Sequence, residues 1–139
     1  MDIILKNGKV FDGSKTPPIV QDVYIKNNKI EKIATNIEVE GTKIIDCSNL
    51  NVAPGFIDAH SHNDFFLEKE IQEKSISPFI KQGITTQVVG NCGFSAYGIH
   101  SNSTHKNEIG GGLFSVAEPK SLAKFITSTE EHLMINIVP

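Results

Sequence analysis

A dense run of residue types that bind metals lies near the middle of the chain, at Asp58-Ala59-His60-Ser61-His62-Asn63-Asp64. Alternate residues of a strand share one face, so Asp58, His60 and His62 would point the same way. Two imidazoles at this spacing, about 6–7 Å apart along the strand, can converge on one divalent metal ion. The alternative is a strand end whose polar residues bond to water or backbone. The preceding apolar strand with Pro54-Gly55 and the flanking acids favour the metal site.

Asn91-Cys92-Gly93 is the second candidate, and it follows the uncharged, β-branched run 84–89. If that run is a strand parallel to the one before His60, Cys92 lies at the same edge as the histidines. A thiolate there would be a tight zinc ligand, and a nearby metal would deprotonate it. A small buried residue before a glycine turn is the alternative, because free cysteine is often buried. The neighbouring His-x-His pair favours the ligand interpretation.

Other residues of these types give weaker signals. Asp58 and Asp64 could form an acid–base pair by residue type, although the sequence does not fix their separation. His132 ends an expected helix, where the helix dipole favours a cation. The remaining candidates are expected to be structural, exposed or hinge-like: Cys47, His100, His105 and the glycines 110–112.

The second part of the chain, residues 51–139, must place these groups. An apolar strand is expected at 52–59, and residues 67–76 could be helix or loop. Ser77 and Pro78 fit the N-cap and first position of a helix that continues over 79–82 and that Gly83 ends. The β-branched run 84–89 is typical of a buried parallel strand. A helix from Pro119 and a strand at 134–138 complete a β-α-β-α-β order, which indicates parallel strands with right-handed crossovers.

The first part, residues 1–50, reads as short strands separated by turns. Asn7-Gly8 predicts a hairpin between strands at 2–6 and 9–11, and Asn27-Asn28 predicts a turn between strands at 22–26 and 29–34. A further strand is expected at 42–46. We therefore expect a small antiparallel β-meander that needs a partner sheet to bury its apolar face.

Composition and length exclude several classes of protein. The chain has 139 residues, 39% hydrophobic and 21% charged, with a net charge of −3, which argues against a nucleic-acid partner. No apolar run reaches the roughly 20 residues of a membrane span, and no signal peptide is evident. Two cysteines favour a reducing cytoplasm over a disulfide framework. A complete (β/α)8 barrel needs about 250 residues, so this chain cannot hold one.

The quoted motifs together resemble the amidohydrolase superfamily. "ILKNGKVFDG" and "VAPGFIDAHSHND" are similar to its small β-sandwich and first barrel strand, and "QGITTQVVGNCGFS" resembles the N-acyl-D-amino-acid deacylase (D-aminoacylase) branch. The resemblance implies an α/β fold: part of a β-sandwich over 1–50, then the first three or so βα units of a TIM-type barrel over 51–139. The chain would thus be an N-terminal fragment.

The resemblance also implies a function and a site. His60, His62 and Cys92 would ligate one or two zinc ions, and the parent enzyme would hydrolyse the amide bond of N-acyl-D-amino acids. The catalytic residues are unknown, because the general base is expected beyond residue 139, so the chain alone should be inactive. It could self-associate through exposed barrel edges. The alternatives are a cyclic-amide hydrolase of the dihydroorotase or hydantoinase type, and a non-catalytic metal-binding module.

Overall fold

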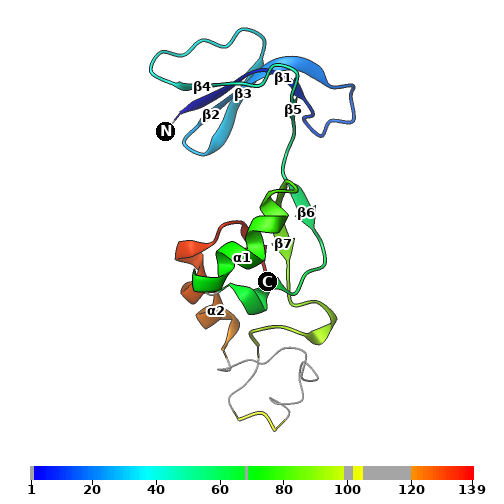
Figure 1. Ribbon diagram of the computed structural model, residues 1–139, viewed down its shortest axis with the longest axis vertical. Helices are drawn as coiled ribbons and strands as arrows, with labels where there is room; N and C mark the ends of the chain where they lie inside the picture. The colour runs from blue at the N-terminus through cyan, green and yellow to red at the C-terminus, as the bar shows by residue number, and fades with distance from the viewer. Residues whose placement is uncertain (1, 68, 99–101, 105–119) are drawn as a thin grey trace. The chain divides into compact units, whose positions relative to one another are not determined.

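The chain divides into two compact units, residues 1–54 and residues 55–139. The computed structural model describes residues 2–67, 69–98, 102–104 and 120–139 (Figure 1). The expectations for His100, His105, the glycines 110–112 and a helix start at Pro119 lie outside these residues. No helix in the described ranges is long and apolar enough to cross a membrane.

The first unit is one mixed β-sheet. Its strands are β1 (Ile3–Val10), β2 (Ile19–Lys26), β3 (Lys29–Ala34), β4 (Lys43–Asp46) and β5 (Asn51–Val52). The order is β3-β2-β1-β4, and β5 also pairs with β1. β1, β2 and β3 are antiparallel, but β4 and β5 both run parallel to β1, so the expected all-antiparallel meander is wrong in this part. The Asn27-Asn28 turn is confirmed, with positive φ at both residues.

The expected hairpin at Asn7-Gly8 is wrong, because β1 continues through both residues. The pairing of β1 with β2 shifts register between Leu5 and Gly8, and Asn7 has φ of 60°. An extra residue of this kind is a β-bulge, which leaves one backbone N–H outside the ladder. Asp22 accepts that N–H from Asn7 at 2.8 Å, so a buried side chain completes the bulge. Asn7 does take the left-handed conformation that the dipeptide favours, but this conformation forms a bulge within the strand and does not reverse the chain.

The second unit contains a parallel sheet with helices. Its strands are β6 (Phe56–Asp58), β7 (Ile84–Val88) and β8 (Asn136–Val138), in the order β6-β7-β8. Its helices are α1 (Lys69–Ile80) and α2 (Leu122–Thr129), with 3-10 turns η1 (Asn63–Phe66), η2 (Asn91–Gly93) and η3 (Glu130–His132). Both strand pairs are parallel, which confirms the expected β-α-β-α-β order.

The helix boundaries differ from the expected ones. α1 begins at Lys69, so Ser77 and Pro78 lie inside its last turns and do not start it. A proline there removes a single helical hydrogen bond, and the buried face of Gln72 and Ile76 holds the helix in place. Gly83 has φ of 83°, as expected for a residue that follows a helix.

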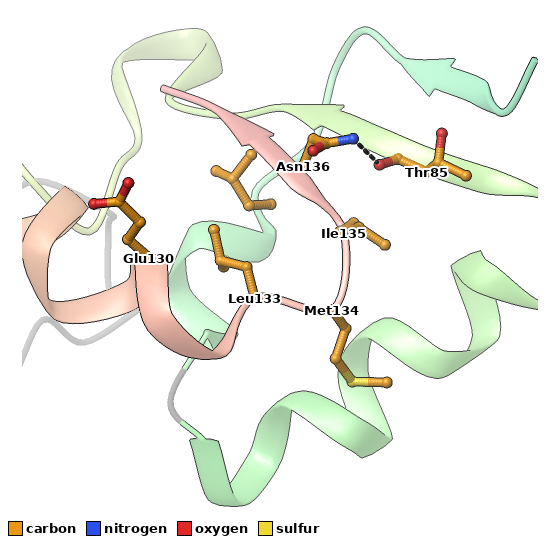
Figure 2. Close-up of a pocket in the computed structure, with 7 residues that line it drawn as sticks. Thr85, Glu130, Leu133, Met134, Ile135 and Asn136 are labelled. Atoms are coloured by element: carbon orange, nitrogen blue, oxygen red, sulfur yellow. Dashed lines mark hydrogen bonds between the residues drawn. The ribbon is translucent and has the colours of Figure 1, made fainter. Parts of the chain in front are cut away.

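The core of the second unit gathers apolar residues from the helices and from the chain leading into β8. Leu67, Ile76, Phe125 and Ile135 form its buried cluster. A cavity of about 480 Å³ opens beside the start of β8 (Figure 2) and is lined by Thr85, Glu130, Leu133, Met134, Ile135, Asn136 and Ile137. Thr85 and Asn136 are near the amino ends of their strands, so this cavity lies away from the edge where His60, His62 and Cys92 follow strand ends.

Candidate metal centre

The carboxyl ends of β6 and β7 bring the predicted ligands to one edge of the sheet. Asp58, the last residue of β6, lies opposite Gln87 in the parallel register. His60 and His62 follow in the loop, so the expectation that they share a strand face is wrong, since β6 already ends at Asp58. The Ser61 N–H donates to Val88 O at 3.0 Å and ties this loop to the end of β7.

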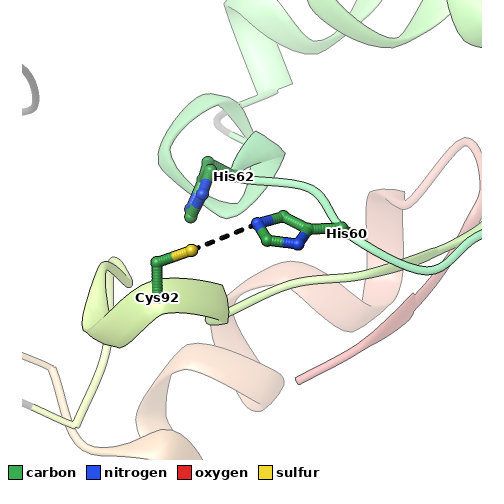
Figure 3. Close-up of side chains that lie close together, drawn as sticks. All are labelled: His60, His62 and Cys92. Atoms are coloured by element: carbon green, nitrogen blue, oxygen red, sulfur yellow. Dashed lines mark hydrogen bonds between the residues drawn. The ribbon is translucent and has the colours of Figure 1, made fainter.

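Cys92 sits in an unusual backbone conformation directly after β7. Its φ of 58° and ψ of 15° lie in the left-handed region, and Gly90 and Gly93 on either side have φ of 74° and 75°. A non-glycine residue in this region is disfavoured by about 1–2 kcal/mol. Such strain persists where the surroundings demand it, often at functional sites. The tight turn directs the Cys92 thiol toward the histidine loop (Figure 3).

The structure brings all three predicted ligands together. Cys92 Sγ lies 3.2 Å from His60 Nε2. One ligand atom each from His60, His62 and Cys92 can be chosen so that all lie within 4.8 Å of one another. His60 and Cys92 are exposed and His62 is half-buried, so the cluster is open to solvent on one side. Within the described ranges, these three residues form the one cluster of histidine, cysteine or acidic side chains that could hold a metal ion.

The donor set fits zinc. Zn²⁺ prefers histidine nitrogen and cysteine sulfur in tetrahedral geometry, with bond lengths that put neighbouring ligand atoms about 3.3–3.7 Å apart. The 3.2 Å between Cys92 Sγ and His60 Nε2 is close to this, and small side-chain rotations would close the wider separations. Three protein ligands also leave a coordination position for water or substrate, as catalytic zinc sites require.

An aromatic side chain supports the half-buried histidine. Phe94 lies two residues after Cys92, and its ring meets the His62 ring edge-on at 6.1 Å between centroids. The His60 and His62 rings are 5.5 Å apart and also nearly perpendicular. These contacts restrict how far the His62 ring can turn, so the ligand loop is partly preorganised.

Asp64 is buried just beyond His62 and is incompletely hydrogen-bonded. Its Oδ2 accepts the Ala96 N–H at 2.7 Å, whereas Oδ1 has no hydrogen-bond partner among the described residues. Burial raises the pKa of Asp64, and the Ala96 N–H and the nearby His62 only partly oppose this. Asp64 thus connects the loop after His62 to the segment after Cys92 at a cost in desolvation.

Sequence reasoning missed the amide side chains that hold these loops. Gln87 in β7 is fully buried and bonds both Asp58 and Asn63. Asn91 Nδ2 donates to Val88 O at 3.0 Å. The signal was present: Gln87 carries a long amide side chain inside an otherwise β-branched, uncharged run, and such a residue needs hydrogen-bond partners when it is buried.

The weaker candidates make hydrogen bonds to other parts of the chain or are buried. Asp58 accepts hydrogen bonds from Gln87 and from the His60 N–H, so it is engaged in the loop. His132 Nε2 lies 3.1 Å from Leu67 O and so reaches across to another segment. Cys47 is buried in the first unit.

Several known proteins are similar to this chain, although no family model matches it. A D-aminoacylase from Alcaligenes xylosoxydans xylosoxydans is 39% identical over 94 residues, which cover 68% of this chain and 19% of that protein. The chain thus spans about a fifth of the length of such curated relatives.

Two solved structures share the fold. An N-acyl-D-glutamate deacylase from Bordetella bronchiseptica, complexed with zinc and a phosphonate inhibitor, matches with a TM-score of 0.67 at 28% identity over 98% of this chain and 28% of that one. A D-aminoacylase described as defining a novel subset of amidohydrolases matches with a TM-score of 0.63 at 35% identity over 73% of this chain and 21% of that one. The chain therefore belongs to the amidohydrolase family and is similar to its D-aminoacylase and N-acyl-D-amino-acid deacylase members.

Proposed function

We propose that this chain carries part of the zinc site of an amidohydrolase that cleaves the amide bond of N-acyl-D-amino acids. The observation that carries the proposal is the convergence of His60, His62 and Cys92 within 4.8 Å. The deacylase relatives, one of which was solved with zinc, support the choice of metal and substrate class. The three side chains would hold one or two zinc ions.

When bound, zinc supplies Lewis acidity, which polarises an amide carbonyl and acidifies water. The chain's own residues would bind the metal, orient one ligand and leave room for the substrate. Cys92 offers a soft, charged sulfur ligand, and His60 and His62 offer neutral nitrogen ligands from one short loop. Phe94 limits rotation of His62, and the exposed side of the cluster leaves an approach for a small substrate.

We further propose how the two units relate to the complete fold. Residues 51–139 would form about the first three βα units of a TIM-type barrel, and residues 1–50 part of a small β-sandwich. The parallel order β6-β7-β8 and the ligands at the carboxyl ends of β6 and β7 support the barrel, since barrel enzymes place their sites at that end. The cytoplasm, which keeps thiols reduced, would suit a free Cys92.

Zinc content tests the proposed site. The 139-residue chain, purified without chelators, should bind zinc, and His60→Ala or Cys92→Ala should lower the bound zinc as measured by elemental analysis. The Cys47→Ala chain is the matched control, because Cys47 lies in the other unit. Equal zinc content in all four proteins would exclude the proposed ligands.

Activity assays test the substrate class. We expect no turnover of N-acetyl-D-amino acids by the 139-residue chain alone, because the described residues bring three candidate ligands together and include no identified general base. A longer gene product, if one exists, should hydrolyse N-acyl-D-amino acids in a Cys92-dependent manner. Hydrolysis of hydantoins that is indifferent to Cys92→Ala would instead indicate a cyclic-amide hydrolase. A stable monomer with tight zinc binding and no activity at full length would indicate a non-catalytic module.

The proposed barrel fragment also has a consequence for assembly. β8 pairs only with β7 within the described residues, so its other edge is open. Open strand edges promote association between chains. We therefore propose self-association of the isolated chain, which size-exclusion chromatography with light scattering would detect.

A further inference from the structure

We propose that Gln87 is a positioning residue for the metal site: its buried side-chain amide joins Asp58 and Asn63, on either side of His60 and His62, and thereby sets where the two imidazoles stand relative to Cys92. This inference rests on the zinc site proposed above. It concerns a residue that binds no metal and acts through the loop that does.

The contacts of Gln87 span the whole ligand loop. Its Nε2 donates to Asp58 Oδ2 at 3.2 Å, at the last residue of β6. Its Oε1 accepts from Asn63 Nδ2 at 2.9 Å, one residue after His62. Gln87 is itself fully buried in β7, so neither end of its amide has water as a substitute. The residue therefore fixes both ends of a loop that carries two ligands.

The direction of this hydrogen-bond chain is determined by its members. A carboxylate only accepts, so the Gln87 NH2 group must face Asp58, and its oxygen must face the donor on Asn63. Asp58 Oδ1 meanwhile accepts the His60 N–H at 3.3 Å, which extends the chain to the backbone of the first ligand. Reversing the amide, or removing one donor, would leave a buried polar group unsatisfied.

Cys92 is held by the same strand end. Val88, next to Gln87, accepts hydrogen bonds from the Ser61 N–H at 3.0 Å and from Asn91 Nδ2 at 3.0 Å. Ser61 lies between the two histidines, and Asn91 precedes Cys92. A shift at Gln87 would therefore change the separation of the His60 and His62 ligand atoms from Cys92 Sγ. Residues that orient metal ligands in this way typically change metal affinity about 10–100-fold when they are mutated.

Gln72 provides a matched control within the same unit. It is nearly as buried, 2% exposed, and its amide is also used at both ends, by Leu67 O at 3.2 Å and the Met134 N–H at 2.7 Å. The first bond joins α1 to the end of the segment that precedes it, the second joins α1 to the segment before β8, and both lie outside the two ligand loops. A purely structural role predicts the same result for both glutamines.

The experiment compares Gln87→Glu with Gln72→Glu in the 139-residue chain. The probe is Co²⁺, which replaces zinc and reports a cysteine ligand through its sulfur-to-cobalt charge-transfer absorption. Gln87→Glu puts a second carboxylate against Asp58, so we expect Co²⁺ to bind about 10–100-fold more weakly with a reduced charge-transfer band. Gln72→Glu should lower the melting temperature of the metal-free chain and leave the band and affinity unchanged. Equal affinities in the two variants would overturn the proposal.

A double variant separates positioning from general damage to the fold. Asp58→Asn combined with Gln87→Glu keeps both hydrogen bonds of the bridge. The new amide at position 58 would donate to the new carboxylate at position 87, and that carboxylate would still accept from Asn63. Recovery of Co²⁺ affinity to within about threefold of the unmodified chain supports positioning. A double variant that folds, by circular dichroism, yet binds as weakly as the single Gln87→Glu variant contradicts it.

Asn63→Ala keeps the proposal testable if Gln87→Glu does not fold, because Asn63 is only half-buried. It removes one end of the bridge and should weaken Co²⁺ binding about tenfold; unchanged binding would count against the bridge. Failure of the proposed zinc site can be distinguished from failure of the positioning role. If the unmodified chain shows no charge-transfer band, or keeps it in Cys92→Ser, the ligand assignment is wrong, whereas a band lost in Cys92→Ser and kept in Gln87→Glu refutes positioning alone.

Discussion

Each unit of the chain buries one aspartate to the same extent, but the two carboxyl groups differ in how completely they are hydrogen-bonded. Asp22 in the β-sheet unit and Asp64 beside the candidate ligand cluster are both 3% exposed. Asp22 accepts the N–H groups of Asn7 and Ile37 at 2.8 Å each and pairs with Lys6 Nζ at 3.2 Å. Asp64 accepts one N–H, and its Oδ1 has no hydrogen-bond partner among the described residues.

The pKa values follow from these surroundings. Burial opposes ionisation of Asp22, but its hydrogen bonds and Lys6 outweigh burial, so its pKa is lowered. Burial dominates at Asp64 and raises its pKa. The first unit thus uses a buried charge to join a β-bulge to a distant turn. The second unit tolerates an incompletely satisfied carboxyl next to the predicted ligands, and departures of this kind from local consistency are typical of functional sites.

The two cysteines give the largest expected difference between the units. Cys92→Ser should lower zinc affinity more than about 100-fold, beyond the loss caused by residues that merely orient ligands. Cys47→Ser should leave zinc affinity unchanged, because Cys47 is buried in the sheet unit. Competition with a colorimetric chelator measures both. Comparable losses in the two variants would show that the site is not confined to the second unit.

Substitution of each aspartate by asparagine tests the second difference. Asp22→Asn places an NH2 group against a backbone N–H and removes the Lys6 pair, so we expect the free energy of unfolding to fall by about 2–3 kcal/mol. Asp64→Asn keeps an acceptor for Ala96 N–H and removes a poorly solvated charge, so its effect should stay within about 1 kcal/mol. Urea denaturation of the metal-free chains measures both. A larger loss in Asp64→Asn would contradict the comparison.

The sequence predicted the three clustered side chains but not the residues that hold them in place. His60, His62 and Cys92 stood out because their side chains have few other reasons to cluster, and parallel strands end at one edge. The support from Gln87, Asn63 and Asn91 depends on which strand lies beside which loop. That register is tertiary information, so the long amide side chain of Gln87 in a β-branched run was the only available signal.

The predicted element boundaries were wrong where a local sequence preference is compatible with two different structures. Asn7-Gly8 favours left-handed backbone, which suits a hairpin and a bulge equally, and the buried Asp22 decides for the bulge. Ser77-Pro78 suits a helix start, but the burial of Gln72 and Ile76 extends α1 upstream. The antiparallel assignment of β4 failed because strand pairing across 40 residues leaves no local pattern.

Two left-handed glycines offer a smaller test of how tightly each unit is packed. Gly13 in the first unit has φ of 81°, and a methyl group added there would meet no other atom within 4 Å. Gly13→Ala should therefore lower the free energy of unfolding by about 1 kcal/mol, from backbone strain alone. Gly90, just before Cys92, has φ of 74°, and a methyl group there would overlap the Tyr97 hydroxyl. Gly90→Ala should therefore cost more and also weaken zinc binding. Equal melting temperatures of the two variants would indicate that Tyr97 moves freely.

The smallest expected effect is the response of the first unit to acid. Because the folded-state pKa of Asp22 lies below its ordinary value of 3.8, its ionisation stabilises the fold above that value, and this stability is lost as the pH falls through the folded-state pKa. The stability difference between the unmodified chain and Asp22→Asn should thus be complete above about pH 5 and shrink as the pH falls below 3.8. Lys6→Met removes one of the groups that lower the pKa of Asp22, so the loss should be smaller and complete at a higher pH. Urea titrations at each pH would measure this, and a pH-independent difference would mean that hydrogen-bond geometry, and not the charge of Asp22, stabilises the bulge.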